Sequence, residues 1–265
     1  MINIQFILSE TNLFILALIM GAFIGGVAGY IGSLMVTKRM ALMGGALGHL
    51  TLPGVALALV YGFDVSLGAL LFLVLGVVLI WLFERRTELP MEALTGVVFA
   101  SSLAAAFLFL PKEKTAQALI GDISQISLVS TIITVVLSLL VFLVTKRIFS
   151  KMVLISISED LAKTQGIDVK KYNFIFLTCI GLTVALGVRI VGGLMTAALV
   201  AIPACTSKNL SKNLFQYSHG ALVIGSASCI LGVLLFKFFG FPAGPMIILT
   251  STGLFLASLI FTKKR

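Results

Sequence analysis

Long apolar runs follow one another along the whole chain, and short stretches rich in Lys, Arg, Gly or Pro separate them. A membrane-spanning helix needs about 20 mainly apolar residues to cross roughly 30 Å of hydrocarbon, and these runs approach that length. The pattern predicts an all-α, polytopic transmembrane helical bundle with about eight or nine spans. The segments expected to cross are 13–36, 41–61, 65–83, 94–110, 128–144, 174–188, 190–206, 220–239 and 246–261.

The span count stays open at one place in particular. The runs 174–188 and 190–206 meet around Arg189, so they predict either two short helices or a re-entrant hairpin. A total of eight crossings would place both termini on the same side of the membrane. Nine crossings would place them on opposite sides.

Basic residues are concentrated in alternate links between the runs, which is the bias expected for the cytoplasmic loops of a membrane protein. When the link that contains Lys38 is placed inside, the inner side also holds Arg39, Arg85, Arg86, Lys146, Arg147, Lys151, Lys163, Lys170, Lys171, Lys208, Lys212, Lys263, Lys264 and Arg265. The outer side then holds Lys112, Lys114, Arg189 and Lys237. The charge pattern therefore predicts a cytoplasmic C-terminus.

Composition supports the membrane assignment and excludes other classes. Hydrophobic residues make up 59% of the 265 residues and charged residues only 11%, so we expect residues 1–265 to form one transmembrane domain in contact with membrane lipid. The net charge of +9 does not indicate nucleic-acid binding, because the basic residues flank apolar runs as topology signals do. The three cysteines, Cys179, Cys205 and Cys229, lie singly inside apolar runs, which argues against a disulfide framework or a structural zinc site.

His49 is the clearest candidate for transport chemistry, because an ionisable group deep in a span is costly. It lies near the middle of the run 41–61, with glycines before it and Pro53 after it. Small residues and a proline that frees a backbone carbonyl are typical of a helix that lines a polar path. His49 is therefore either a metal ligand on a pathway or a neutral histidine hydrogen-bonded to a neighbouring helix. The other histidine, His219, lies at the start of a span and is interpreted as an interface residue.

The inner segment 156–171 contains a short helix signal. Ser158 is placed as the N-cap, Glu159 and Asp160 stand in the first turn, and Gly166 is placed as the stop. Such a capped element either docks into a cytosolic partner or lies on the membrane surface. The chain has no Gly-x-x-x-x-Gly-Lys-Ser/Thr phosphate loop, so energy for pumping would come from elsewhere.

Several motifs, in order, resemble the permeases of the zinc/manganese/iron ABC importer family. They are MALMG at 40–44, AL at 46–47 before His49, LPGVALA at 52–58, DLA at 160–162 with Gly166, VGGLMTAALVAIPA at 191–204 and PAGP at 242–245. The resemblance covers most of the chain.

The resemblance implies the permease of an ATP-driven importer for a divalent metal ion, zinc or manganese first and iron after them, in a bacterial plasma (inner) membrane. It implies a cytosolic ATP-binding subunit, an extracytoplasmic metal-binding protein and a second permease copy as partners. ATP hydrolysis would occur in the partner, so this chain would not be an enzyme and would hold no cofactor of its own. The ATP-binding subunit would dock on Glu159, Asp160, Leu161, Ala162 and Gly166.

The sequence departs from the family pattern beside His49. Family members typically have an Asp one helical turn before this histidine and a Ser directly before it, and here those positions are Gly45 and Gly48. Without the Asp, the site lacks a hard oxygen donor and a negative charge. Three explanations fit this change: a ligand from another span, a pathway of His49 and backbone carbonyls, or a divergent ABC permease for another substrate.

Two other classes of function remain for comparison. A secondary transporter could couple transport to protons through His49, although no acid lies inside an expected span. A membrane-embedded enzyme is disfavoured, because the spans hold no cluster of His, Glu or Asp for a catalytic metal.

Overall fold

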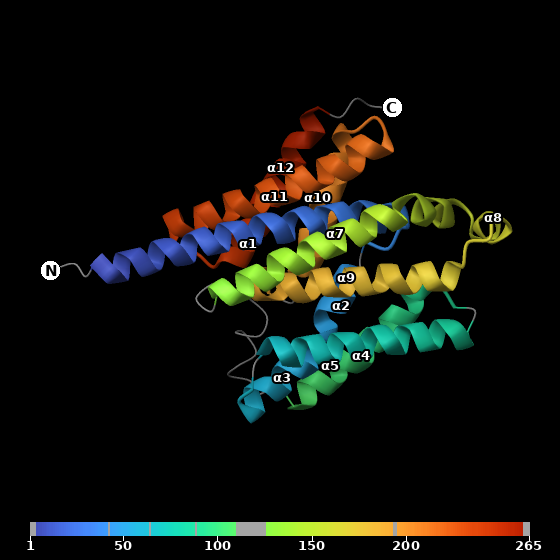
Figure 1. Cartoon of the computed structure of the whole chain (residues 1–265), viewed down its shortest axis with the longest axis horizontal. Helices are drawn as coiled ribbons and strands as arrows, with labels where there is room; N and C mark the ends of the chain where they lie inside the picture. Colours follow the sequence, from blue (N-terminus) through green and yellow to red (C-terminus); the bar gives the residue numbers. More distant parts are fainter. Residues whose placement is uncertain are drawn as a thin grey trace.

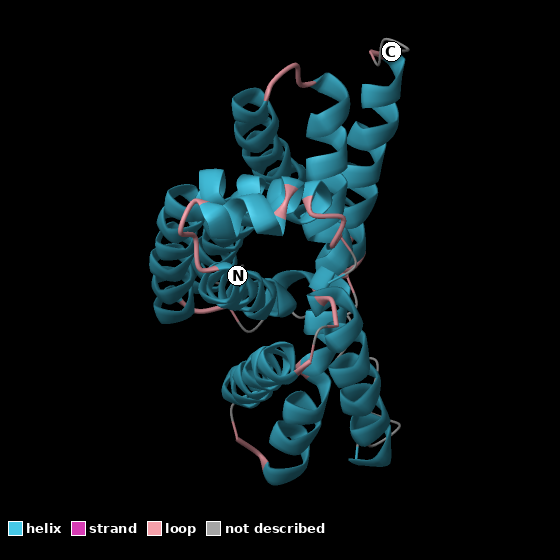
Figure 2. Cartoon of the chain, turned by 90° about the vertical axis from the view of Figure 1, so that its right-hand side faces the viewer, coloured by secondary structure: helices cyan, strands magenta, loops and turns pink. Residues whose placement is uncertain are grey.

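The computed structural model describes residues 4–41, 43–63, 65–87, 89–109, 126–192 and 195–261, and within them the chain forms helices and loops only (Figure 2). The all-α prediction is thereby confirmed for this part of the chain. The helices are α1 (Ile4–Thr37), α2 (Met43–Leu50), α3 (Leu52–Tyr61), α4 (Val65–Arg86), α5 (Met91–Phe109), α7 (Leu128–Ile157), α8 (Glu159–Thr164), α9 (Val169–Val191), α10 (Thr196–Leu210), α11 (Leu214–Phe239) and α12 (Ala243–Ile260).

Successive long segments run in opposite directions, with α2 and α3 following one another as one broken segment (Figure 1). The short helix α8 and the end of α12 lie on one side of the bundle, and α1 starts on the other (Figure 1). Helix α1 contacts α7, α9, α10 and α11, so it forms the central element of the larger part of the bundle.

Six helical segments of the described chain are long and apolar enough to cross a membrane, namely Asn12–Thr37, Leu67–Arg86, Leu128–Ile157, Val169–Val188, Leu214–Phe239 and Ala243–Ile260. Two further expected spans correspond to shorter apolar helices, Met43–Ala58 and Met91–Ala106. The total of eight or nine crossings therefore stays a prediction.

The structure refines three of the expected segments. The run 41–61 is divided into α2 and α3 at Thr51, and the runs 174–188 and 190–206 form two separate helices that end and begin on either side of Gly192. Helix α7 continues beyond the expected end at 144 to Ile157, because buried side chains such as Met152 and Ile155 extend its packed face. The expected outer residues Lys112 and Lys114 and the basic residues of the tail, 263–265, lie outside the described residues, as do Leu42, Leu110, Gly193 and Leu194.

Glycines let α1 and α11 approach closely. A Cβ at Gly25 would lie 2.4 Å from the carbonyl oxygen of Gly225, and one at Gly29 would lie 2.1 Å from that of Ala221. Both distances are shorter than any real Cβ contact, so only glycine fits at these two positions. Because water supplies no drive to association inside a bilayer, close backbone packing of this kind holds such helices together.

Candidate metal pathway and cytosolic contact helix

His49 lies in the last turn of α2 and faces α5. Its imidazole ring packs against the ring of Phe99, with 5.3 Å between the ring centroids. Among the residues that the structure describes, Nδ1 is buried and has no hydrogen-bond partner. A buried polar atom without a partner costs about 1–3 kcal/mol. One of the two interpretations was a neutral histidine hydrogen-bonded to a neighbouring helix, and within the described residues the structure shows no such bond at Nδ1.

The helix break directly after His49 has a local cause. Residue 53 is proline and has no N–H, so the carbonyl of His49 cannot receive the usual bond from four residues further on. Thr51 stabilises the bend instead, since its hydroxyl donates to the carbonyl oxygen of Gly48 at 2.6 Å. His49 therefore stands beside backbone whose helical bonding is interrupted, which is the arrangement found where a helix lines a polar path.

The Gly45 position, where the resembled family has an Asp, is a close contact with α10. A Cβ at Gly45 would lie 2.9 Å from the Cβ of Ala197. Gly44 packs against the same residue, since a Cβ added at Gly44 would lie 3.6 Å from the Cα of Ala197. The missing carboxylate is thus accompanied by tight packing of α2 on α10.

The described residues contain no group of three or more His, Cys, Asp or Glu side chains that could hold a metal ion. His49 is therefore not part of a cluster of three such side chains in this part of the chain, and a ligand from another span stays a prediction. One oxygen was not expected from the sequence. Within the described chain, the hydroxyl of Ser102 on α5 is buried without a hydrogen bond, and it lies three residues after Phe99 on the same helical face. Serine is common in membrane helices, so no sequence signal marked it.

The predicted capped helix on the inner segment is confirmed as α8. The Ser158 hydroxyl accepts a hydrogen bond from the backbone N–H of Leu161 at 3.2 Å, and Gly166 adopts a left-handed φ of 74° directly after the helix. Of the residues expected to contact a partner, Glu159, Asp160, Leu161 and Gly166 are exposed, whereas Ala162 is fully buried. Ala162 therefore anchors α8 to the bundle, Glu159, Asp160 and Leu161 form its outer face, and Gly166 follows the helix.

A part-buried chain of polar side chains joins three elements and was not expected from the sequence. The ammonium of Lys38 donates to Oδ1 of Asn173 at 2.9 Å, and Nδ2 of Asn173 donates to Oε1 of Glu84 at 2.9 Å. The chain joins the turn after α1 to α9 and α4. Burial lowers the pKa of Lys38, and the charges of Glu159 and Glu84 act in the opposite direction.

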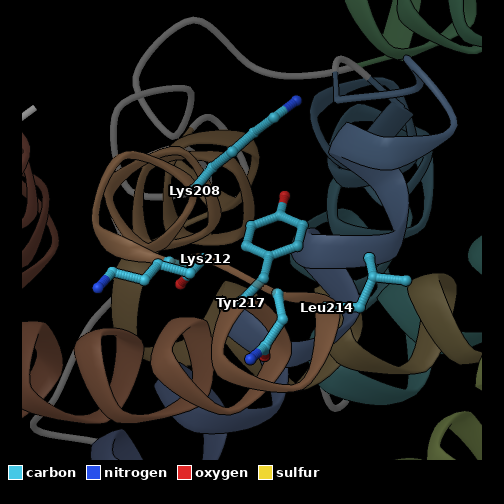
Figure 3. A pocket seen from close by; sticks show the side chains of 6 residues that line it. Lys208, Lys212, Leu214 and Tyr217 are labelled. Carbon is cyan, nitrogen blue, oxygen red and sulfur yellow. The ribbon is translucent and has the colours of Figure 1, made fainter. Parts of the chain in front are cut away.

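A pocket of about 260 Å³ lies at the turn between α10 and α11, where Lys208, Lys212, Leu214 and Tyr217 line it together with Ser211 and Asn213 (Figure 3). Its lining holds two lysines and no carboxylate or imidazole, so its charge does not favour a cation. His219 lies nearby in sequence on α11, stacked on Phe215 with 4.0 Å between ring centroids. It is half-buried, with its ring centroid 5.8 Å from that of Tyr30 on α1, and its interpretation as a residue at the membrane interface stays a prediction.

Comparison with known protein families assigns the chain. The model of the ABC 3 transport family matches residues 10–262, nearly the whole sequence. The chain belongs to the ABC 3 transport family. The all-helical bundle, the broken segment that carries His49 and the capped helix α8 are therefore features of one member of this family.

Named relatives of this family member cover almost its full length. The manganese import system permease protein ScaB of Streptococcus gordonii is 28% identical over 253 residues, which are 94% of this chain and 91% of the relative. The high-affinity zinc uptake system membrane protein ZnuB of Haemophilus influenzae is 28% identical over 260 residues, which are 94% of this chain and 97% of the relative. A chain of the solved PsaBC structure from Streptococcus pneumoniae, in complex with Fab, has a TM-score of 0.77 at 27% identity and covers 92% of this chain and 89% of its own length.

Proposed function

We propose that this chain is the permease subunit of an ATP-driven importer for a divalent transition-metal ion, with zinc and manganese as the first substrates to test. The observation that carries the proposal is the near full-length match to permeases named for manganese and zinc import. His49 supports it from the structure, because its buried Nδ1 has no partner within the described chain and an imidazole nitrogen is a good ligand for such ions.

We assign the metal path to the region where α2 faces α5. His49 would bind the ion transiently, and oxygen donors at this place would be the Ser102 hydroxyl and backbone carbonyls near the break at Thr51. Such neutral oxygens are weak ligands compared with a carboxylate. A pathway with one imidazole and no acid would bind loosely, which suits a site that must release its ion again.

Energy would come from a separate cytosolic ATP-binding subunit that docks on the outer face of α8, formed by Glu159, Asp160 and Leu161, and on Gly166 after it. The exposure of these four residues and the burial of Ala162 support this assignment, because a docking element needs both an accessible face and a firm attachment. An extracytoplasmic metal-binding protein and a second copy of the permease complete the proposed assembly.

The proposed orientation places α8, the turn between α10 and α11 and the end of α12 in the cytoplasm of a bacterium, with residues 1–265 as one multi-pass domain of the plasma membrane. The charge bias supports it, since the basic links predicted to be inner lie on the side of the bundle that holds α8 (Figure 1).

The test is metal uptake by proteoliposomes that contain the permease with its ATP-binding subunit, to which the extracytoplasmic metal-binding protein is added with zinc and manganese in turn. We expect ATP-dependent uptake by the wild type, and a loss of about ten-fold or more for His49→Ala, because even the outer partners of metal ligands contribute about 10- to 100-fold. His219→Ala is the matched control, since it removes the other imidazole from a place outside the proposed path.

Full uptake by His49→Ala would remove the pathway role of this residue. Equal losses in both histidine variants would indicate a general effect of histidine removal instead of a metal contact. Absence of ATP-dependent uptake of either metal by the wild type would overturn the proposed substrate class.

A further inference from the structure

The hydrogen-bonded chain of half-buried Lys38, buried Asn173 and half-buried Glu84 connects the end of α1, α9 and α4 at the end of the bundle that carries α8 (Figure 1). The two hydrogen bonds, each 2.9 Å long, join residues that are 135 and 89 positions apart in the sequence. Asn173 is only 4% exposed, and both ends of its amide are engaged. Lys38 and Glu84 are therefore held apart by one amide and do not pair directly.

The hydrogen-bonded chain from Lys38 to Glu84 leaves one carboxylate oxygen without a partner, which points to a second arrangement of these side chains. Oε2 of Glu84 is buried and, within the described residues, has no hydrogen-bond partner. A buried carboxylate oxygen is costly in this condition, and a direct contact with the Lys38 ammonium would relieve the cost. The charge of Glu159 on α8 acts on the pKa of Lys38 in the same direction as that of Glu84, and α8 contacts α9, which carries Asn173. Two carboxylates, the half-buried Glu84 and the exposed Glu159, thus act on the same ammonium.

Lys38 is well placed to pass a change on to α2. It is the last residue before Arg39, which adopts a left-handed φ of 60° where glycine is usual at the end of a helix. The turn is closed by hydrogen bonds from the backbone N–H of Met40 to the carbonyl of Met35 at 2.8 Å and from that of Arg39 to Val36 at 3.1 Å. The carbonyl of Met40 in turn accepts from the backbone N–H of Met43, at the start of α2, at 3.0 Å, so hydrogen bonds connect this turn to α2.

We infer that Lys38, Asn173 and Glu84 form a coupling relay, in which a partner bound at Glu159 of α8 changes the position of Lys38 and thereby shifts α2 and His49. The inference rests on the proposed function, because it assumes that α8 receives an ATP-binding subunit. Docking withdraws or neutralises the Glu159 charge, and the balance at Lys38 moves toward Glu84. The three residues are positioning residues and do not touch the ion.

The experiment measures metal ions imported per ATP hydrolysed by the reconstituted complex of permease and ATP-binding subunit in the presence of the extracytoplasmic metal-binding protein. We expect Lys38→Met and Glu84→Gln each to lower this ratio by roughly five-fold or more while ATP hydrolysis continues, since coupling between sites is commonly worth about 5- to 150-fold. Lys146→Met removes the same charge from an exposed position on α7 and is expected to keep the wild-type ratio.

The double variant Lys38→Met/Glu84→Gln tests whether the two residues act as one relay or have two separate local effects. It removes both charges together, so neither is left unpaired, and it keeps the test usable if one single variant fails to fold. Two independent effects of about five-fold would multiply to about 25-fold, whereas residues that act as one unit give about five-fold again. A wild-type ratio in Lys38→Met or Glu84→Gln, or multiplied losses in the double variant, would overturn the relay and leave the proposed function standing. A wild-type complex that imports neither metal would overturn the proposed function itself, and the relay with it.

Discussion

The contact between Gly45 and Ala197 offers a sharp test of the packing around the candidate metal path. Substituting Gly45 with Ala adds one Cβ, which the structure places 2.9 Å from the Cβ of Ala197. Carbon atoms pack best at about 3.5–4.0 Å, so α2 or α10 has to move by several tenths of an ångström. We expect the variant to fold with reduced stability.

The size of the effect follows from two opposing contributions. Overpacking of this kind costs about 1–3 kcal/mol, and replacing glycine by alanine inside a helix returns up to about 1 kcal/mol. Gly96→Ala on α5 measures the gain from replacing glycine by alanine on its own, because no neighbouring described atom lies within 4 Å of the added Cβ. The difference between Gly45→Ala and Gly96→Ala should therefore be about 1–3 kcal/mol, with Gly96→Ala neutral or slightly stabilised.

Thermal and denaturant unfolding of the full chain in one detergent measures this difference. In an Ala197→Gly background the penalty of Gly45→Ala should disappear, since the opposing Cβ is gone. If Gly45→Ala is tolerated as well as Gly96→Ala, the close approach of α2 and α10 is wrong. The same background also permits Gly45→Asp without the clash, and we expect it to raise manganese uptake relative to zinc, because a carboxylate is a harder ligand than imidazole.

Two further predictions concern the frame of the molecule and α8. Gly29→Ala should destabilise the chain by more than about 2 kcal/mol, because its Cβ would lie 2.1 Å from the Ala221 carbonyl oxygen. In the control Gly21→Ala the added Cβ meets nothing closer than 3.5 Å, so this variant should be tolerated. Equal unfolding temperatures of the two variants would contradict the close packing of α1 and α11. Ser158→Ala removes the N-cap of α8 and should weaken this helix by about 1 kcal/mol. Hydrogen exchange at the Leu161 amide should then become faster. Unchanged exchange there would show that burial of Ala162 alone holds α8 in place.

Features that depend on nearby residues could be predicted well. The apolar runs, the Ser158 cap and the Gly166 stop are local, and the structure confirms helices and caps there. The break at Thr51 followed from Pro53 only in part, since the sequence indicated a freed carbonyl but not two separate helices. The length of α7 was underestimated, because the charged residues after 144 ended the apolar run without ending the helix.

The sequence by itself determined a helical membrane protein with one conspicuous histidine and a capped short helix, because hydropathy and capping act over a few neighbouring residues, and its motifs carried the resemblance to a permease family. Only the tertiary structure decided that His49 faces Phe99, that Gly45 abuts Ala197 and that Lys38 reaches Glu84 through Asn173. These contacts join helices far apart in the chain, and their existence depends on how closely whole helices pack. No local pattern of residues carries that information.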